Sequence, residues 1–132
     1  MSFIKSYLVT FIVFIILELF WLIILAKDLY AKELGYIMKS EPDLIPAAVF
    51  GLLFVGGLVF FVVNPAIDQN SWSYALFSGI LYGLITYATY TLTNLANLES
   101  WPLKVTIIDL LWGMVLGGAA STISFFILNR FK

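Results

Sequence analysis

The sequence contains no cysteine and no histidine. Without cysteine the chain can form no disulfide, no thiolate nucleophile and no iron–sulfur ligand. Without histidine it has no catalytic triad that uses an imidazole, and no His-ligated zinc or haem. We therefore expect no cofactor. An enzyme built on this chain would have to use carboxylates and tyrosines for acid–base chemistry, so an enzymatic role is not our first expectation.

Charged residues are also scarce, at 11% of the 132 residues, whereas 62% are hydrophobic. A compact globule of this composition lacks the polar surface that keeps a protein dissolved in water. The seven Lys and Arg residues are scattered along the chain, so they form no basic stripe for nucleic-acid phosphates. The composition predicts an integral membrane protein that is surrounded by the lipid bilayer, and it excludes nucleic acid as a partner.

Four apolar runs are long enough to cross a bilayer, which takes roughly 20 residues each. They predict helices over approximately 5–27, 44–63, 72–93 and 105–129. The predicted fold is all-α, a polytopic membrane protein with a four-transmembrane-helix bundle in a single domain over residues 1–132. The connection after the first run mixes apolar and charged residues, which is typical of an amphipathic interfacial helix over 28–39 or of an extension of the first span.

Four crossings place both termini on one side of the membrane, which we call face A. The connections 27–43 and 93–104 then lie on the other side, face B. Positively charged residues in short loops usually mark the cytoplasmic side. Here the two sides are nearly balanced, with Lys5, Arg130 and Lys132 against Lys27, Lys32, Lys39 and Lys104. The count does not decide the orientation, and we expect cytoplasmic termini.

Two carboxylates, Glu18 and Asp109, interrupt the first and last apolar runs. An acid inside the membrane costs about 2.5–3.5 kcal/mol on insertion scales, so it normally faces the protein interior and has a partner or a function. Each acid is followed three residues later by a tryptophan, Trp21 or Trp112. Two interpretations remain open: the acids bind a ligand or proton, or they only fix the register of the helices.

Depth along the helices suggests how these four residues pair. At about 1.5 Å per residue, Glu18 and Trp112 lie roughly 12–13 Å below face B, and Asp109 and Trp21 roughly 8–9 Å below it. If the first and last helices are neighbours, each indole N–H reaches the carboxylate of the other helix. Buried donors and carboxylates both require partners. We therefore predict a crossed pair of hydrogen bonds.

The third span adds polar side chains that become more frequent toward face B. Tyr87, Tyr90 and Asn94 share one stripe of this helix. A hard cation such as Mg²⁺ usually gathers more oxygen ligands than this region offers, so we expect no metal site. The candidate ligand- or proton-binding residues, which share the face-B half of the bundle, are Glu18, Trp21, Tyr87, Tyr90, Asn94, Asp109 and Trp112.

Small residues recur every four positions in the last two spans. This spacing is typical of closely packed membrane helices. In an antiparallel hairpin, Gly83 lies level with Gly117. The pattern predicts that these helices pack through Gly79, Gly83, Gly113 and Gly117.

The stretch from Tyr87 to Gly113 reads Y-A-T-Y-T-L-T-N-L-A-N-L-E-S-W-P-L-K-V-T-I-I-D-L-L-W-G. It resembles the signature of a bacterial membrane family, domain of unknown function 2177, and the acid-x-x-Trp of the first span fits the same pattern. The resemblance covers essentially the whole chain. The family pattern usually carries Asp where this chain has Thr91, and Asp rather than Glu at position 18. The resemblance implies a four-helix membrane protein and brings no established activity. We expect it in the bacterial inner membrane.

Three functions are compatible with these residues. The first is a proton- or cation-binding transporter or channel-like protein that uses Glu18 and Asp109, supported by aromatic residues that can hold organic cations. The second is a lipid-binding or lipid-modifying enzyme or accessory factor. The third is a structural protein that binds partner helices. Because four short helices enclose little volume, we also expect a homo-oligomer.

Overall fold

The computed structural model describes residues 2–39 and 43–131, and every element in these residues is helical. Four helical segments are long and apolar enough to cross a membrane: Phe3–Leu25, Leu44–Asp68, Trp72–Asn97 and Leu103–Arg130. The predicted all-α class with four membrane helices is confirmed. The elements in chain order are α1 (Phe3–Phe20), η1 (Trp21–Leu25), α2 (Lys27–Leu34), α3 (Leu44–Leu58), η2 (Val59–Val63), α4 (Asn64–Asp68), α5 (Trp72–Asn97) and α6 (Leu103–Arg130).

The helix ends differ from the sequence-based expectation in physically understandable ways. The second span continues past Pro65 to Asp68, and the third continues to Asn97. Both extensions contain polar residues, Asn64 and Asp68 in the second span and Asn94 and Asn97 in the third, so hydropathy alone does not include them. The helix that we expected over 28–39 ends at Leu34. One face-A charge of our count, Lys132, lies outside the described residues.

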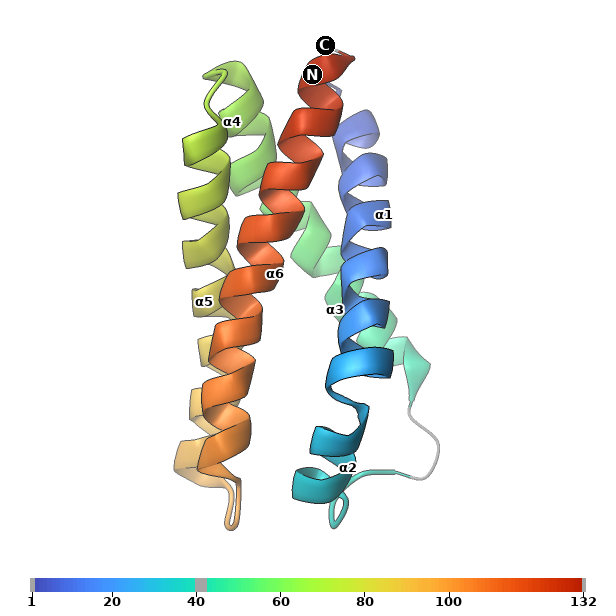
Figure 1. Ribbon diagram of the computed structural model, residues 1–132, viewed down its shortest axis with the longest axis vertical. Coiled ribbons are helices and arrows are strands. Elements are labelled where there is room, and N and C mark those ends of the chain that lie inside the picture. Colours follow the sequence, from blue (N-terminus) through green and yellow to red (C-terminus); the bar gives the residue numbers. More distant parts are fainter. Residues whose placement is uncertain (1, 40–42, 132) are drawn as a thin grey trace.

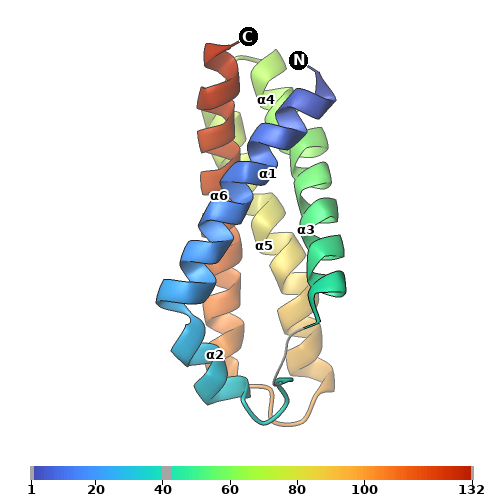
Figure 2. The same cartoon turned by 90° about the vertical axis from the view of Figure 1, so that its right-hand side faces the viewer.

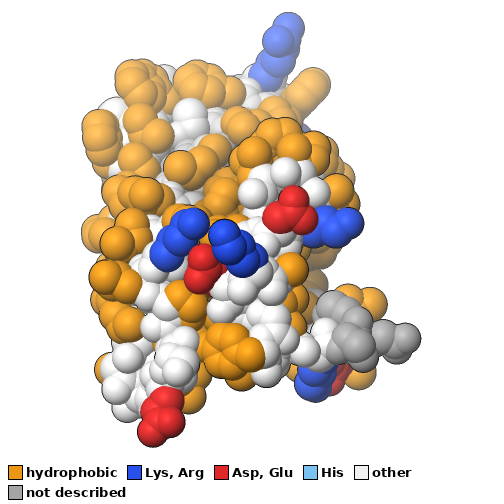
Figure 3. All heavy atoms as spheres, turned by 60° about the horizontal axis from the view of Figure 1, so that its bottom comes forward, with side chains coloured by type: hydrophobic (Ala, Val, Ile, Leu, Met, Phe, Trp, Pro, Cys, Tyr) orange, Lys and Arg blue, Asp and Glu red, His pale blue; other side chains and the backbone are white. Residues whose placement is uncertain are grey.

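The spans alternate in direction, so the two ends of the described chain lie together at one end of the bundle (Figure 1). The short helix α2 and the connection between α5 and α6 lie at the opposite end, which is face B. Figure 2 shows α1 crossing α6 at an angle. Seen from near face B, charged side chains cluster over this end, whereas hydrophobic side chains cover the flanks (Figure 3). Those flanks are suited to contact with lipid.

Polar side chains mark where two of the spans begin. Asp43 accepts a hydrogen bond from the backbone N–H of Ile45 at 3.1 Å, and Ser71 accepts one from Tyr74 at 3.1 Å. Each cap satisfies a backbone donor that has no partner within its helix. The four-span arrangement is therefore supported by local signals as well as by hydropathy.

The helices α5 and α6 run side by side through a seam of glycines. A Cβ atom added to Gly83 would collide with the carbonyl of Gly113, and one added to Gly117 would collide with the carbonyl of Gly79. The two backbones therefore approach so closely that only glycine fits at these positions. These are the four glycines that the sequence pattern pointed to.

Tyrosine hydroxyls hold the second span against its neighbours. Tyr82 of α5 donates to the carbonyl of Phe54 at 2.8 Å, and Tyr74 donates to that of Phe61 at 3.2 Å. Pro65, four residues after Phe61, has no N–H, so that carbonyl has no backbone donor at the ordinary α-helical spacing. The Phe61 bond lies toward face A, and the Phe54 bond lies near the middle of the span. Toward face B, residues 44–50 of α3 are all exposed, so α3 begins apart from the other helices.

Candidate functional site

Glu18 lies between three helices in the face-B half of the bundle. Its Oε1 atom accepts a hydrogen bond from the indole Nε1 of Trp112 on α6 at 2.9 Å. The same oxygen accepts a second bond from the hydroxyl of Tyr87 on α5 at 3.3 Å. The carboxylate of α1 is thus held by two neutral donors from two other helices. The depth argument from sequence anticipated the Trp112 bond.

The second acid, Asp109, is only 2% exposed. Its Oδ1 atom accepts a hydrogen bond from the hydroxyl of Tyr30 on α2 at 2.5 Å. The Tyr30 oxygen in turn accepts the Nε1 proton of Trp21 at 3.4 Å. Asp109 and Trp21 therefore belong to one hydrogen-bonded chain, with Tyr30 between them.

A tryptophan stack joins the two carboxylates. The rings of Trp21 and Trp112 lie 4.5 Å apart between centroids, with an angle of 5° between their planes. One indole donates to Glu18 and the other to Tyr30, which donates to Asp109. The result is a continuous row of side chains from Tyr87 through Glu18 and the two tryptophans to Asp109. We call these six residues, including Tyr30, the acid–tryptophan cluster.

The predicted bond from Trp21 to Asp109 is wrong, and the reason is the path of the chain after Trp21. Residues Trp21–Leu25 form a π-helical turn, closed by a hydrogen bond from the Ala26 N–H to the Trp21 carbonyl at 2.8 Å. At Ala26 the chain changes direction, and α2 packs against α6. This turn brings the Tyr30 hydroxyl between the indole and the carboxylate. Single π-helical turns are frequent at functional sites.

Two of the predicted site residues lie outside the hydrogen-bonded row. Tyr90 is 51% exposed and packs edge-on against Trp101, with 5.9 Å between ring centroids. Asn94 is partly exposed, and its backbone carbonyl accepts the bond that ends α5, from the N–H of Leu98 at 2.9 Å. In the described residues no side-chain hydrogen bond joins either of them to Glu18 or Asp109.

Thr91 lies beside Asp109 on the α5 side and is fully buried. Its hydroxyl oxygen and Asp109 Oδ2 do not reach hydrogen-bonding geometry, and both are buried without a partner among the described residues. Buried polar oxygens are normally hydrogen-bonded. This half of the Asp109 carboxyl therefore has unused capacity to bind a proton or a polar group.

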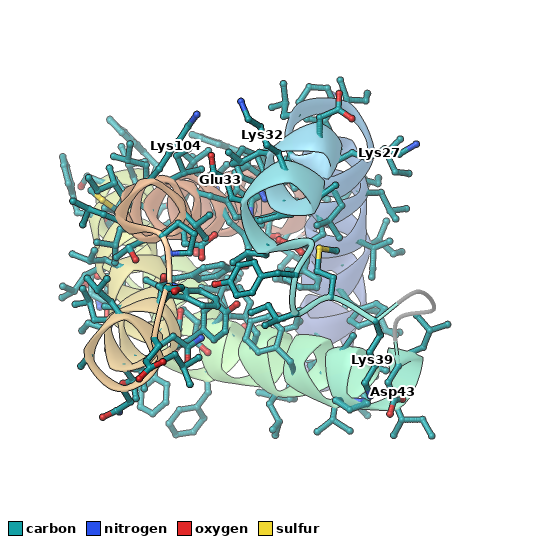
Figure 4. All side chains as sticks on the ribbon, turned by 90° about the horizontal axis from the view of Figure 1, so that it is seen from below. Lys27, Lys32, Glu33, Lys39, Asp43 and Lys104 are labelled. Carbon is teal, nitrogen blue, oxygen red and sulfur yellow. The ribbon has the colours of Figure 1, made fainter. Side chains whose placement is uncertain are left out.

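No basic side chain neutralises either acid in the part of the chain that the structure describes. The salt bridge at this end joins Lys104 to Glu33 at 3.9 Å, and both belong to the surface. Figure 4 shows the amino groups of Lys32 and Lys104 directed outward, away from the bundle interior. Within residues 2–39 and 43–131 no group of three acidic side chains is placed to share a metal ion. The acids are thus held by neutral donors.

Tyr30 is a partly buried donor outside the membrane spans. Burial and the neighbouring Asp109 carboxylate raise the pKa of the Tyr30 hydroxyl well above its ordinary value. The hydroxyl therefore keeps its proton under physiological conditions and stays a hydrogen-bond donor to Asp109.

A cavity of about 320 Å³ lies next to the cluster, between α3 and α5. It is lined by Phe50, Thr86, Tyr87 and Tyr90. The Tyr87 hydroxyl bonds to Glu18, so this tyrosine separates the cavity from the carboxylate. We call this cavity the aromatic pocket.

Residues 3–126 match the family described as "Predicted membrane protein (DUF2177)". The chain belongs to this family. The resemblance that the Tyr87–Gly113 stretch suggested is thereby confirmed. No curated protein and no solved structure was found to match the chain. For this DUF2177 protein, function has to be inferred from the site itself.

Tyr30 is the site residue of this DUF2177 protein that sequence reasoning missed. In the sequence, Tyr30 is one of several apolar or aromatic positions of the amphipathic connection. The feature that could have identified it is its position: Tyr30 follows Trp21 by nine residues, and it is the tyrosine on α2. Buried indole N–H groups need acceptors, and a nearby hydroxyl is a natural one.

Proposed function

We propose that this protein binds a proton or a small cation at the acid–tryptophan cluster and transfers it across the membrane. The observation that carries the proposal is that two intramembrane carboxylates are hydrogen-bonded only by neutral donors in the described chain. A carboxylate pair without a basic partner in a low-dielectric region gains stability by taking up a proton or a cation.

The depth of the cluster supports this proposal. Glu18 lies seven residues, or roughly 10 Å, from the face-B end of its span at Leu25. Acids at such depth are costly unless they have a function or a partner. A structural role alone would be served as well by a neutral amide, which makes the same hydrogen bonds without the insertion cost of a charge.

The arrangement also allows the proton to move between groups. The tyrosine hydroxyls on either side, Tyr87 and Tyr30, can rotate about their C–O bonds and exchange one acceptor for another. Protonation of Glu18 would leave the Trp112 bond in place and weaken it, because hydrogen bonds to ionised acceptors are stronger. The state of the acid is thereby linked to the contact between α1 and α6.

Proton flux into liposomes tests the proposal. Purified protein is reconstituted with a pH-sensitive dye inside, and an inward proton gradient or a potassium diffusion potential is applied. We expect flux above that of empty liposomes, lost in Glu18→Gln and reduced in Asp109→Asn. The control is Asp68→Asn, which removes an exposed acid at the opposite end of the bundle. Equal flux in wild type and Glu18→Gln would refute the proposal.

A lipid-binding function is the second candidate, and the aromatic pocket is the observation that favours it. The pocket is almost entirely apolar in its lining and opens on the flank of the bundle. If the flux assay is negative, native mass spectrometry of the protein released from nanodiscs should reveal a retained lipid that Phe50→Trp displaces. The absence of any retained lipid would remove this candidate.

For orientation and assembly we propose cytoplasmic termini in a bacterial inner membrane and a homo-oligomer. The chain has no cysteine, so a single cysteine at Ser2 or Ser100 can be labelled selectively. An impermeant maleimide added to intact cells should reach Ser100→Cys and not Ser2→Cys. A monomeric mass in nanodiscs, for protein that shows full flux in liposomes, would contradict the oligomer.

A further inference from the structure

The aromatic pocket lies within the thickness of the membrane. Its lining residues Phe50 and Tyr90 are six and seven residues from the face-B ends of their spans, at Leu44 and Asn97. At about 1.5 Å per residue they lie roughly 10 Å below that end. Phe50 is 44% exposed and Tyr90 is 51% exposed, so the pocket is open at the flank of the bundle. Its mouth therefore faces lipid.

The opening arises from the way the second span is fixed. The hydrogen bonds from Tyr82 to Phe54 and from Tyr74 to Phe61 join α5 to the span from Phe54 onward. Before Phe54, residues 44–50 are exposed, and the start of α3 lies apart from α5 (Figure 1). The result is a wedge between the two helices, wide toward face B and closed at Phe54.

Aromatic rings line this wedge. Phe50 and Phe54 each approach Tyr87 edge-on, with centroid distances of 6.3 and 6.4 Å, and they lie 5.6 Å from each other. Tyr90 forms the wall one helical turn away from Tyr87. The faces of aromatic rings carry partial negative charge and attract cations within about 6 Å.

A carboxylate stands behind this wall, because Glu18 Oε1 accepts a hydrogen bond from the Tyr87 hydroxyl at 3.3 Å. The lining residues include no Lys or Arg. A positively charged ligand is therefore favoured over an anion or a neutral molecule of the same size. The pocket volume of about 320 Å³ is at the lower end for small-molecule sites.

We propose that the aromatic pocket binds a lipophilic organic cation, such as a quaternary ammonium or phosphonium ion, that reaches it from the bilayer. One or two aromatic or alkyl groups of the cation lie in the wedge, and the remainder stays among the acyl chains. The inference rests on the proposed function, because the cation and the proton would both depend on the charge of Glu18.

A second cavity provides an internal comparison. It measures about 280 Å³ and lies between α5 and α6. It has no aromatic and no acidic residue in its lining, which consists of Leu76, Ile80, Leu111, Met114, Val115, Gly118 and Ala119. We expect no preference for cations there.

Binding of tetraphenylphosphonium to the purified protein tests the proposal, with tetraphenylborate as an anion of the same shape. We expect tetraphenylphosphonium to bind saturably and tetraphenylborate not to bind saturably. Phe50→Leu and Glu18→Gln should each weaken it about tenfold. Phe60→Leu, which changes an exposed aromatic of η2 outside the pocket, is the matched control and should bind as wild type does. Gel filtration and circular dichroism establish that each variant is folded.

The possible outcomes separate the pocket from the proposed function. The proposed cation site in the pocket is refuted if Phe50→Leu leaves binding of tetraphenylphosphonium unchanged. It is also refuted if tetraphenylborate binds saturably and equally well. If the cation does not bind but proton flux depends on Glu18, the cation site in the pocket is refuted and the proposed transport function is supported. Pocket-dependent cation binding without any Glu18-dependent flux supports the pocket and refutes the transport proposal.

Discussion

Helix α6 makes two contacts of opposite kind on two of its faces. Toward α5 it offers glycines, and the two backbones meet almost directly (Figure 1). Toward α1 and α2 it offers Trp112 and Asp109, whose contacts are hydrogen bonds and a ring stack. Gly113 and Trp112 are consecutive, yet they serve different faces, because successive helical residues are rotated by about 100°.

The difference teaches how a small bundle can hold a polar site. The glycine seam is fixed by backbone shape, and in the described residues no side-chain hydrogen bond crosses it. The α1–α6 contact depends on side chains that can exchange partners. We therefore regard the α5–α6 pair as a rigid platform and α1 with α2 as the part that responds to the state of the acids.

The largest effect is expected from breaking the seam. Gly117→Leu places a side chain where even a Cβ would collide with the Gly79 carbonyl. Overpacking of this kind costs about 1–3 kcal/mol or more. The free energy of unfolding, measured by titration with sodium dodecyl sulfate, should fall accordingly. Gly56→Ala is the control, because its Cβ would lie 3.6 Å from the Tyr7 ring, an ordinary contact. Equal stability of wild type and Gly117→Leu would contradict the seam.

A smaller effect is expected from the cluster side of α6. Trp112→Phe removes the indole donor to Glu18 and leaves a carboxylate inside the bundle with one donor fewer, at a cost of about 1–3 kcal/mol. Because Glu18 is the acceptor, the cost should shrink when Glu18→Gln is already present, as a double-mutant cycle measures. Trp72→Phe changes an exposed tryptophan and is the control. Equal costs for Trp72→Phe and Trp112→Phe would show that the bond contributes nothing.

Much of the fold followed from the sequence, because span length and glycine spacing are set by helix geometry. The Trp112–Glu18 bond was predictable for the same reason, since a constant rise per residue places the two at one depth. The position of Tyr30 was not predictable in this way. It depends on the change of direction at Ala26, which hydropathy does not encode. The aromatic pocket likewise depends on where Tyr74 and Tyr82 fasten the second span.

The smallest effect is expected from Tyr30→Phe, and it should depend on pH. At neutral pH the loss of the bond to Asp109 should cost about 1 kcal/mol, the typical net contribution of one hydrogen bond. Tyr36→Phe removes a hydroxyl of the same connection that donates to the Ser100 carbonyl and contacts neither acid, so it measures the cost of losing an exposed hydrogen bond.

At alkaline pH the stability of wild type and of Tyr30→Phe should differ further. The pKa of Tyr30 is raised in the folded protein by burial and by Asp109. The stability that its protonated hydroxyl contributes is fully present below the unfolded pKa of about 10, and it is lost as pH rises through the higher folded value. Wild type should therefore lose stability above pH of about 10 more steeply than Tyr30→Phe. Unfolding titrations between neutral and strongly alkaline pH measure these slopes. If stability falls equally with pH in wild type and in Tyr30→Phe, the Tyr30 hydroxyl is exposed to water. The hydrogen-bonded link from Trp21 through Tyr30 to Asp109 would then be refuted.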